Sequence, residues 1–244
     1  MKIMSPLMHR YRLFAQSTRL AVIVIAFLAH AWRLEAVAQK PVSILEKIEW
    51  TWEVKPDHPD AQLPNVLLLG DSISRNYYPD VEANLKGIAN IYLMACSTSI
   101  GDPRLESQIV EFAAAEHVRF QVVHFNNGMH GWSYTEEQYR AEFPRYLRAV
   151  RKLIGRKGAL IWANTTPVRS DADSGATNPR IEERNQIAWS FVKPAGIPLD
   201  DQFKLMQQHQ DLHEDSVHYN QAGAKLQGDQ ASAMIRDALK ASGT

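Results

Sequence analysis

Short apolar runs alternate with amphipathic segments along most of this chain. Runs of four to six mainly apolar residues occur at 65–69, 90–94, 120–125, 159–163 and 196–199. A continuous apolar run of this length is typical of a strand buried on both faces of a sheet. The sequence therefore predicts about five strands, of which the last is short.

Segments with apolar residues at helical spacing separate these runs. They lie at 78–85, 105–117, 135–154, 178–192 and 221–241. Pro79 is acceptable in a first helical turn, whereas Pro144 inside the third segment predicts a kink or a later start. Alternation of strand and helix predicts an α/β protein, a three-layer α/β/α sandwich with a central parallel sheet of about five strands.

The first 38 residues have a different pattern. Basic residues occur before position 20, an apolar run fills 20–32, and Ala36 and Ala38 are small residues spaced as in a cleavage site. This layout predicts a secretory signal peptide at 1–38, cleaved after Ala38, and hence a secreted or periplasmic protein without stable membrane insertion after cleavage. The alternative is a retained membrane anchor, although spanning a bilayer takes about 20 apolar residues. We interpret 39–63 as a polar leader segment and 64–244 as one domain.

Composition narrows the functional classes. The chain has 27 basic and 27 acidic residues, and this zero net charge gives no sign of nucleic-acid binding. Cys96 is the single cysteine, so the sequence allows no internal disulfide and no thiolate metal cluster. The sequence has no metal-ligand spacing and no phosphate-binding glycine loop, so we expect no cofactor and no metal.

A candidate nucleophile follows the first strand. Gly70, Asp71 and Ser72 come directly after the run at 65–69, where ligand sites of parallel sheets lie. A serine hydroxyl is a weak nucleophile and needs a neighbouring base. The alternative is that Asp71 or Ser72 only caps the following helix.

A candidate base precedes the last helix. Asp215 and His218 lie three residues apart, which lets the carboxylate reach one ring nitrogen while the other faces outward. The chain order is Ser72, Asp215, His218. No Gly-x-Ser-x-Gly elbow surrounds Ser72, which argues against the α/β-hydrolase fold.

These blocks resemble the SGNH (GDSL-like) hydrolase family over about residues 64–242. Residues 66–74 and 215–218 match the family's first and last blocks, and the continuation at 219–223 is also typical. The resemblance implies the flavodoxin-like SGNH hydrolase fold and a serine esterase that works without a cofactor. It implies two-step acyl transfer, with Ser72 as nucleophile, His218 as base and Asp215 as its carboxylate partner.

The two middle blocks depart from the family pattern. Gly101 best matches the second-block glycine, and His130 stands where the family usually has asparagine, as in a subgroup of SGNH proteins. The resemblance implies an oxyanion hole formed by the backbone N–H groups of Ser72 and Gly101 and by the His130 side chain. A neutral imidazole N–H donates to an oxyanion much as an amide does. The alternative donor is Asn127.

The resemblance also bears on the substrate. It implies a small-molecule or polysaccharide ester, with short-chain acyl (above all acetyl) groups on carbohydrate as the first expectation. Arg75, Arg104 and Trp132 are candidate substrate contacts. The alternatives are a lipid, aryl or thioester hydrolase of the same fold, which an open apolar groove near Trp132 would favour, and a non-catalytic carbohydrate-binding module.

Overall fold

A computed structural model of the chain describes residues 42–169 and 175–243. The signal peptide predicted at 1–38 lies outside these residues. Among the described helices, none has the length and hydropathy that crossing a membrane requires.

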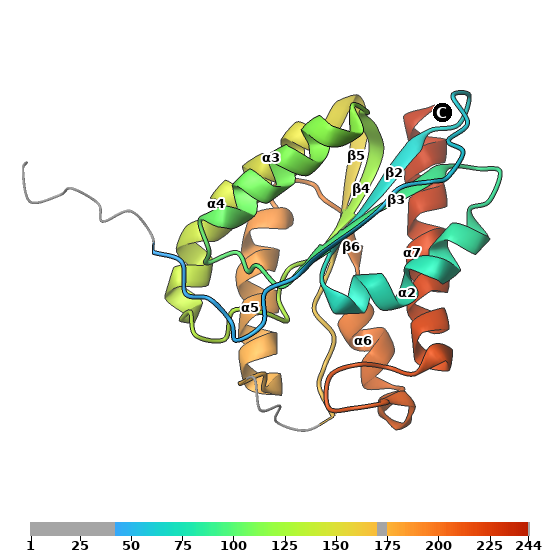
Figure 1. Cartoon of the computed structure of the whole chain (residues 1–244). Coiled ribbons are helices and arrows are strands. Elements are labelled where there is room, and N and C mark those ends of the chain that lie inside the picture. The colour runs from blue at the N-terminus through green and yellow to red at the C-terminus, as the bar shows by residue number, and fades with distance from the viewer. Residues whose placement is uncertain (1–41, 170–174, 244) are drawn as a thin grey trace, which may run out of the picture. The chain divides into compact units, whose positions relative to one another are not determined.

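One six-stranded sheet forms the centre of the fold, in the order β1-β3-β2-β4-β5-β6 (Figure 1). Strand β1 pairs antiparallel with β3, and the other neighbours pair in parallel. The strands are β1 (Thr51–Val54), β2 (Asn65–Gly70), β3 (Asn90–Cys96), β4 (Phe120–Phe125), β5 (Ile154–Ala163) and β6 (Leu199–Asp200).

Helices cover both faces of this sheet, which confirms the predicted three-layer α/β/α sandwich. Helices α3, α4 and α5 lie over one face, and α2 and α7 lie over the other (Figure 1). The bounds are α2 (Ser72–Asn84), α3 (Arg104–Glu116), α4 (Glu136–Leu153), α5 (Asn178–Val192), α6 (Gln202–Gln207), the 3-10 turn η1 (Gln210–Leu212) and α7 (Gln221–Ser242).

The central strand β2 divides its side chains between the two layers. Leu67 and Leu69 pack with α3, α4 and α5, while Val66 and Leu68 pack with α2 and α7. All four are almost completely buried. Alternate side chains of a strand point to opposite faces, so a strand covered on both sides is apolar at every position.

The structure corrects several element predictions. Strand β1 forms within the segment interpreted as a leader, and it adds an antiparallel edge to the sheet. Helix α2 begins at Ser72, six residues earlier than predicted, and Pro79 lies well inside it. Helix α4 continues without a break through Pro144. In both helices, packing against the core outweighs the hydrogen bond that a proline lacks.

A buried histidine–carboxylate hydrogen bond joins the middle of the sheet to its last strand. His124 Nε2 lies 2.7 Å from Asp200 Oδ2, and both side chains are at most 1% exposed. Gln202 and Gln230 donate to the same carboxylate at 2.9 and 2.6 Å. Burial raises the pKa of Asp200. The hydrogen bond and charge of His124 and the two amide hydrogen bonds lower the pKa by more, so the net shift is downward.

Removing the Asp200 carboxylate should lower the stability of the folded protein. Asp200→Ala leaves a buried imidazole and two amides without their acceptor, so we expect a loss of about 3–5 kcal/mol in the free energy of unfolding, measured in urea. Because the pKa of Asp200 is lowered, its contribution is present above its unfolded pKa and is lost as the pH falls through its folded pKa. Asp237→Ala, which removes a surface pair with Lys240, is the control and should change the free energy little. Equal stabilities of the two variants would contradict the prediction.

Candidate active site

Strand β2 delivers Ser72 to the start of a helix. The strand ends at Gly70, and Asp71 caps α2 by accepting a hydrogen bond from the Ile73 N–H at 2.9 Å. A Cβ atom at Gly70 would lie 2.1 Å from Ser74 Oγ, so the tight exit from the strand requires glycine. Asp71 therefore organises the loop, and Ser72 is the first residue of α2.

Ser72, His218 and Asp215 form one hydrogen-bonded chain. Ser72 Oγ lies 2.7 Å from His218 Nε2, and His218 Nδ1 lies 2.8 Å from Asp215 Oδ2. Because a carboxylate only accepts, the Nδ1 proton belongs to this second bond. The lone pair of Nε2 then faces the serine hydroxyl. This is the geometry in which an imidazole removes a proton from serine.

The loop that carries Asp215 and His218 is rigid for local reasons. Asp215 Oδ1 accepts the backbone N–H groups of Val217 and His218 at 2.7 and 2.6 Å. The Glu214 N–H donates to the His218 carbonyl at 2.9 Å, which closes the turn. Asn76 of α2 donates to the Tyr219 carbonyl at 2.7 Å and so ties this loop to the helix that begins with Ser72.

The environment keeps the Asp215 carboxylate charged. Burial raises its pKa, but the hydrogen bonds from the His218 and Val217 backbones and from the His218 ring lower the pKa to about 2. A charged carboxylate holds the imidazole in the tautomer that faces Ser72, and it stabilises the imidazolium once a proton has been taken up.

The loops after β3 and β4 pack against each other. In the loop after β3, the Asp102 N–H donates to the Ser99 carbonyl, and Gly101 lies within this turn. A Cβ atom at Gly101 would lie 2.5 Å from the ring of Tyr134, and one at Gly131 would lie 2.0 Å from Ser99 Oγ. Glycine at both positions allows the two loops to pack closely.

The two alternative oxyanion donors have different surroundings. Asn127 donates to the Thr98 carbonyl at 2.9 Å and accepts the Ile100 N–H at 3.0 Å, so both of its amide groups brace the loop after β3. His130 Nδ1 lies 2.9 Å from Glu46 Oε2, and its Nε2 is buried without a hydrogen-bond partner among the described residues. Of the two side chains, His130 is therefore the one with an uncommitted polar atom.

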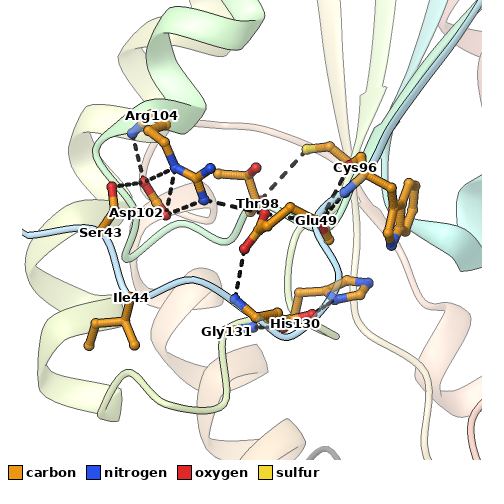
Figure 2. A network of polar contacts seen from close by, with 12 residues as sticks. Ser43, Ile44, Glu49, Cys96, Thr98, Asp102, Arg104, His130 and Gly131 are labelled. Atoms are coloured by element: carbon orange, nitrogen blue, oxygen red, sulfur yellow. Dashed lines mark hydrogen bonds and ion pairs between the residues drawn. The ribbon is translucent and has the colours of Figure 1, made fainter.

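The three predicted substrate contacts differ in whether their side chains are already bound by other residues. Arg104 is held by Asp102 at 2.7 Å and by Glu49 at 3.2 Å, which fastens the leader to the start of α3 (Figure 2). Trp132 is 8% exposed, and its ring N–H donates to the Met129 carbonyl at 2.7 Å. These two side chains have structural partners, whereas Arg75 is exposed on α2, one turn after Ser72.

Arg75 forms part of an aromatic surface that the sequence analysis did not identify. Its guanidinium carbon lies 5.0 Å from the ring centre of Trp52 and 5.6 Å from that of Trp50. Trp52 is 51% exposed, and the Trp50 ring meets the His130 ring edge-on at 5.7 Å. We call Arg75, Trp50 and Trp52 the arginine–tryptophan surface. Apolar and polar residues alternate strictly over 48–54, and this signal could have revealed the strand that carries it.

A groove lies between the leader and the loop after β4. Its volume is about 490 Å³, and part of its lining is apolar. The groove adjoins His130 through Trp50, which contacts the ring, and through Glu46, which binds it. The lining residues are Leu45, Glu46, Lys47, Ile48, Trp50, Trp132 and Ser133.

No protein-family model and no curated protein matches this chain. Among solved structures, the chain is similar to a member of the lipolytic protein G-D-S-L family from Veillonella parvula DSM 2008. The identity is 17% and the TM-score 0.56, and the match covers 70% of this chain and 98% of that one. The fold is therefore that of the GDSL/SGNH hydrolases.

Two further similar structures are carbohydrate esterases. One is the acetyl xylan esterase AlAXEase, at 15% identity and a TM-score of 0.53, covering 70% of this chain and 99% of that one. The other is a mutant of Axe2, an acetyl-xylooligosaccharide esterase from Geobacillus Stearmophilus, at 12% identity and a TM-score of 0.57, covering 72% and 94%.

The charge of Asp215 can be tested by carboxyl-carbon NMR. Its titration midpoint should lie near pH 2 and should rise toward the ordinary value of 3.8 in His218→Ala, which removes the ring hydrogen bond. The stabilisation from this carboxylate is present above pH 3.8 and is lost as the pH falls through 2. His209→Ala, a change outside the hydrogen-bonded chain, should leave the midpoint unchanged. A wild-type midpoint at or above 3.8 would contradict the assignment.

Proposed function

We propose that this protein is a serine esterase that hydrolyses short-chain acyl esters, above all acetyl esters, on carbohydrate. The observation that carries the proposal is the hydrogen-bonded chain from Ser72 through His218 to Asp215, with distances of 2.7 and 2.8 Å. Ser72 directly follows the parallel strand β2, and ligand sites of such folds lie at the carboxyl ends of the strands.

The reaction proceeds in two acyl-transfer steps. His218 Nε2 takes the hydroxyl proton of Ser72 while Oγ attacks the ester carbonyl carbon. The oxyanion that forms is bound by the backbone N–H groups of Ser72 and Gly101 and by the His130 ring. His218 then protonates the leaving alcohol, and water hydrolyses the acyl-enzyme. Loss of one oxyanion donor should raise the barrier by about 3 kcal/mol.

The arginine–tryptophan surface supports carbohydrate as the alcohol. Trp52 and Ala95 are paired across β1 and β3, and Ala95 is paired with Gly70 of β2, two residues before Ser72. The surface therefore begins two strands away from the nucleophile. An exposed indole face packs against the C–H face of a sugar ring, and a guanidinium donates to hydroxyl oxygens. Two of the similar structures are esterases of acetylated xylan or xylo-oligosaccharides by name.

A second candidate substrate is an ester with a larger apolar acyl or aryl group. The groove between the leader and the loop after β4 supports it, because Leu45, Ile48 and Trp50 contribute apolar side chains beside His130. In that case the acyl chain would lie in the groove, and chain length would raise the rate. Export through residues 1–38 remains our proposal, and it suits the carbohydrate substrate because polymeric esters lie outside the cytoplasm.

Hydrolysis of p-nitrophenyl acetate and octanoate tests the nucleophile and the acyl preference together. The acetate should be the better substrate, and Ser72→Ala should abolish its turnover, because no other group occupies the position of Oγ. Asp215→Asn should lower kcat by about 10⁴-fold through loss of the correct imidazole tautomer.

Ser107→Ala, an exposed serine on α3, is the matched control and should retain full activity. A preference for the octanoate would favour the second candidate. Turnover that survives Ser72→Ala would overturn the mechanism, and an inactive wild type that still binds acetylated polysaccharide would support the binding-module alternative.

Trp52→Ala tests the carbohydrate surface. We expect KM for acetylated xylo-oligosaccharides to rise about 3- to 10-fold, equivalent to about 1 kcal/mol of stacking, with kcat nearly unchanged. Turnover of p-nitrophenyl acetate should not change, because that ester does not reach Trp52. Val110→Ala, at an apolar residue on α3 that is 48% exposed, controls for the loss of surface area. An unchanged KM in Trp52→Ala would remove this surface from the substrate site.

A further inference from the structure

The leader contributes a carboxylate to the loop that carries His130. Glu46 accepts the Gly131 N–H at 2.8 Å through one oxygen and lies 2.9 Å from His130 Nδ1 through the other. The leader is held on either side of Glu46, since the Ile44 N–H donates to the Tyr134 hydroxyl at 2.6 Å and the Trp50 N–H to Ser97 Oγ at 2.9 Å. Figure 2 shows this segment crossing the loop at His130 and Gly131.

This contact fixes where the His130 ring carries its proton. A carboxylate has no proton to give, so the bond to Glu46 requires the N–H at Nδ1. A neutral imidazole has one N–H only, and Nε2 is then a bare acceptor. A bare acceptor repels an oxyanion instead of binding it. The sequence-based expectation of a neutral imidazole donor is therefore incompatible with Nε2 as the donating atom.

We propose that Glu46 is a positioning residue that makes His130 an imidazolium, so that a charged Nε2–H binds the oxyanion. The inference rests on the proposed esterase function. In the imidazolium both ring nitrogens are donors, so Nδ1 remains bound to Glu46 while Nε2–H is left to bind the reacting oxygen. A charge-assisted bond of this kind is stronger than a neutral one.

The lack of a partner at Nε2 agrees with this assignment. The atom has almost no solvent-accessible surface and no hydrogen-bond partner among the described residues. Buried polar atoms without partners are rare and call for an explanation. An acceptor supplied by the reaction intermediate provides one.

The charged groups around His130 favour its cationic form. Burial lowers the pKa of His130, but its hydrogen bond to Glu46 and the negative charges nearby raise the pKa by more, so the net shift is upward. The positive Arg184 reaches the His130 backbone carbonyl at 2.8 Å and not the ring. The acidic groups that act on the ring are Glu46 and Glu49 of the leader and Asp71. The exposed Arg75 lies on the Trp50 ring, which meets the His130 ring edge-on.

The proposal predicts a rate that falls at high pH as His130 loses its proton. In Glu46→Gln, which keeps an acceptor at Nδ1 but removes the charge, this fall in kcat/KM should move to lower pH by about one unit or more. In His130→Asn, whose amide does not titrate, it should disappear. Glu53→Gln, at an exposed carboxylate of β1, is the matched control and should have the wild-type profile.

Nitrogen NMR of His130 gives a readout that does not depend on turnover. The wild-type ring should carry protons on both nitrogens near neutral pH, and its titration midpoint should fall in Glu46→Gln but not in Glu53→Gln. A neutral ring near neutral pH, with its proton on either nitrogen, would overturn the proposal, as would a midpoint and a rate profile that Glu46→Gln leaves unchanged.

The two hypotheses fail separately. Turnover that survives Ser72→Ala would overturn the esterase mechanism, while the His130 midpoints would still decide whether Glu46 holds an imidazolium. Turnover could instead be lost in Ser72→Ala while the wild type and His130→Asn have equal rates at every pH. This result would support Ser72 as nucleophile and would overturn the charged His130 donor.

Discussion

Strand β2 lies between β3 and β4 in parallel register, and the rest of the site depends on this pairing. Parallel strands end at the same edge of a sheet, so the loops after these three strands leave it side by side. The Asn126 N–H continues the pairing by donating to the Leu69 carbonyl at 2.9 Å, one position past the end of β4. The serine turn, the Gly101 loop and the His130 loop are neighbours for this reason.

Three histidine–carboxylate pairs occur among the described residues, and their surroundings differ. The pair of His124 and Asp200 is at most 1% exposed and joins strands. The pair of His218 and Asp215 is 38% and 55% exposed and lies next to Ser72. The pair of His130 and Glu46 is intermediate, at 17% and 29%. The same two groups thus support the fold where water is excluded and are available for proton transfer where one ring nitrogen faces a hydroxyl.

The leader is part of the folded domain and of the site. Its edge strand β1 completes the sheet, Glu49 pairs with Arg104, and Glu46 binds the His130 loop. Trp50 and Trp52 bring aromatic surface beside Arg75. This polar, charged segment therefore covers one side of the loops that follow β3 and β4.

The sequence by itself determined the layered fold and indicated the pairing of Asp215 with His218. Strands buried on both faces are apolar at every position, which is visible as a short run in the sequence. Asp215 and His218 lie within one short loop, so their pairing follows from their spacing. The bond between Ser72 and His218 spans 146 positions and was inferred from a resemblance. The early start of α2 escaped prediction because Pro79 indicated a first helical turn near 78, whereas packing on α7 keeps this proline inside the helix.

Only the tertiary structure decided the surroundings of His130. Glu46 lies 84 residues away in sequence, and no spacing rule links a leader carboxylate to a loop after the fourth strand. The same holds for Asn127, whose amide braces Thr98, and for Arg104 and Trp132, whose partners occupy them. Residue type shows which chemistry a side chain offers. Which nitrogen holds the proton, and which donor is already engaged, depend on neighbours that folding alone brings together.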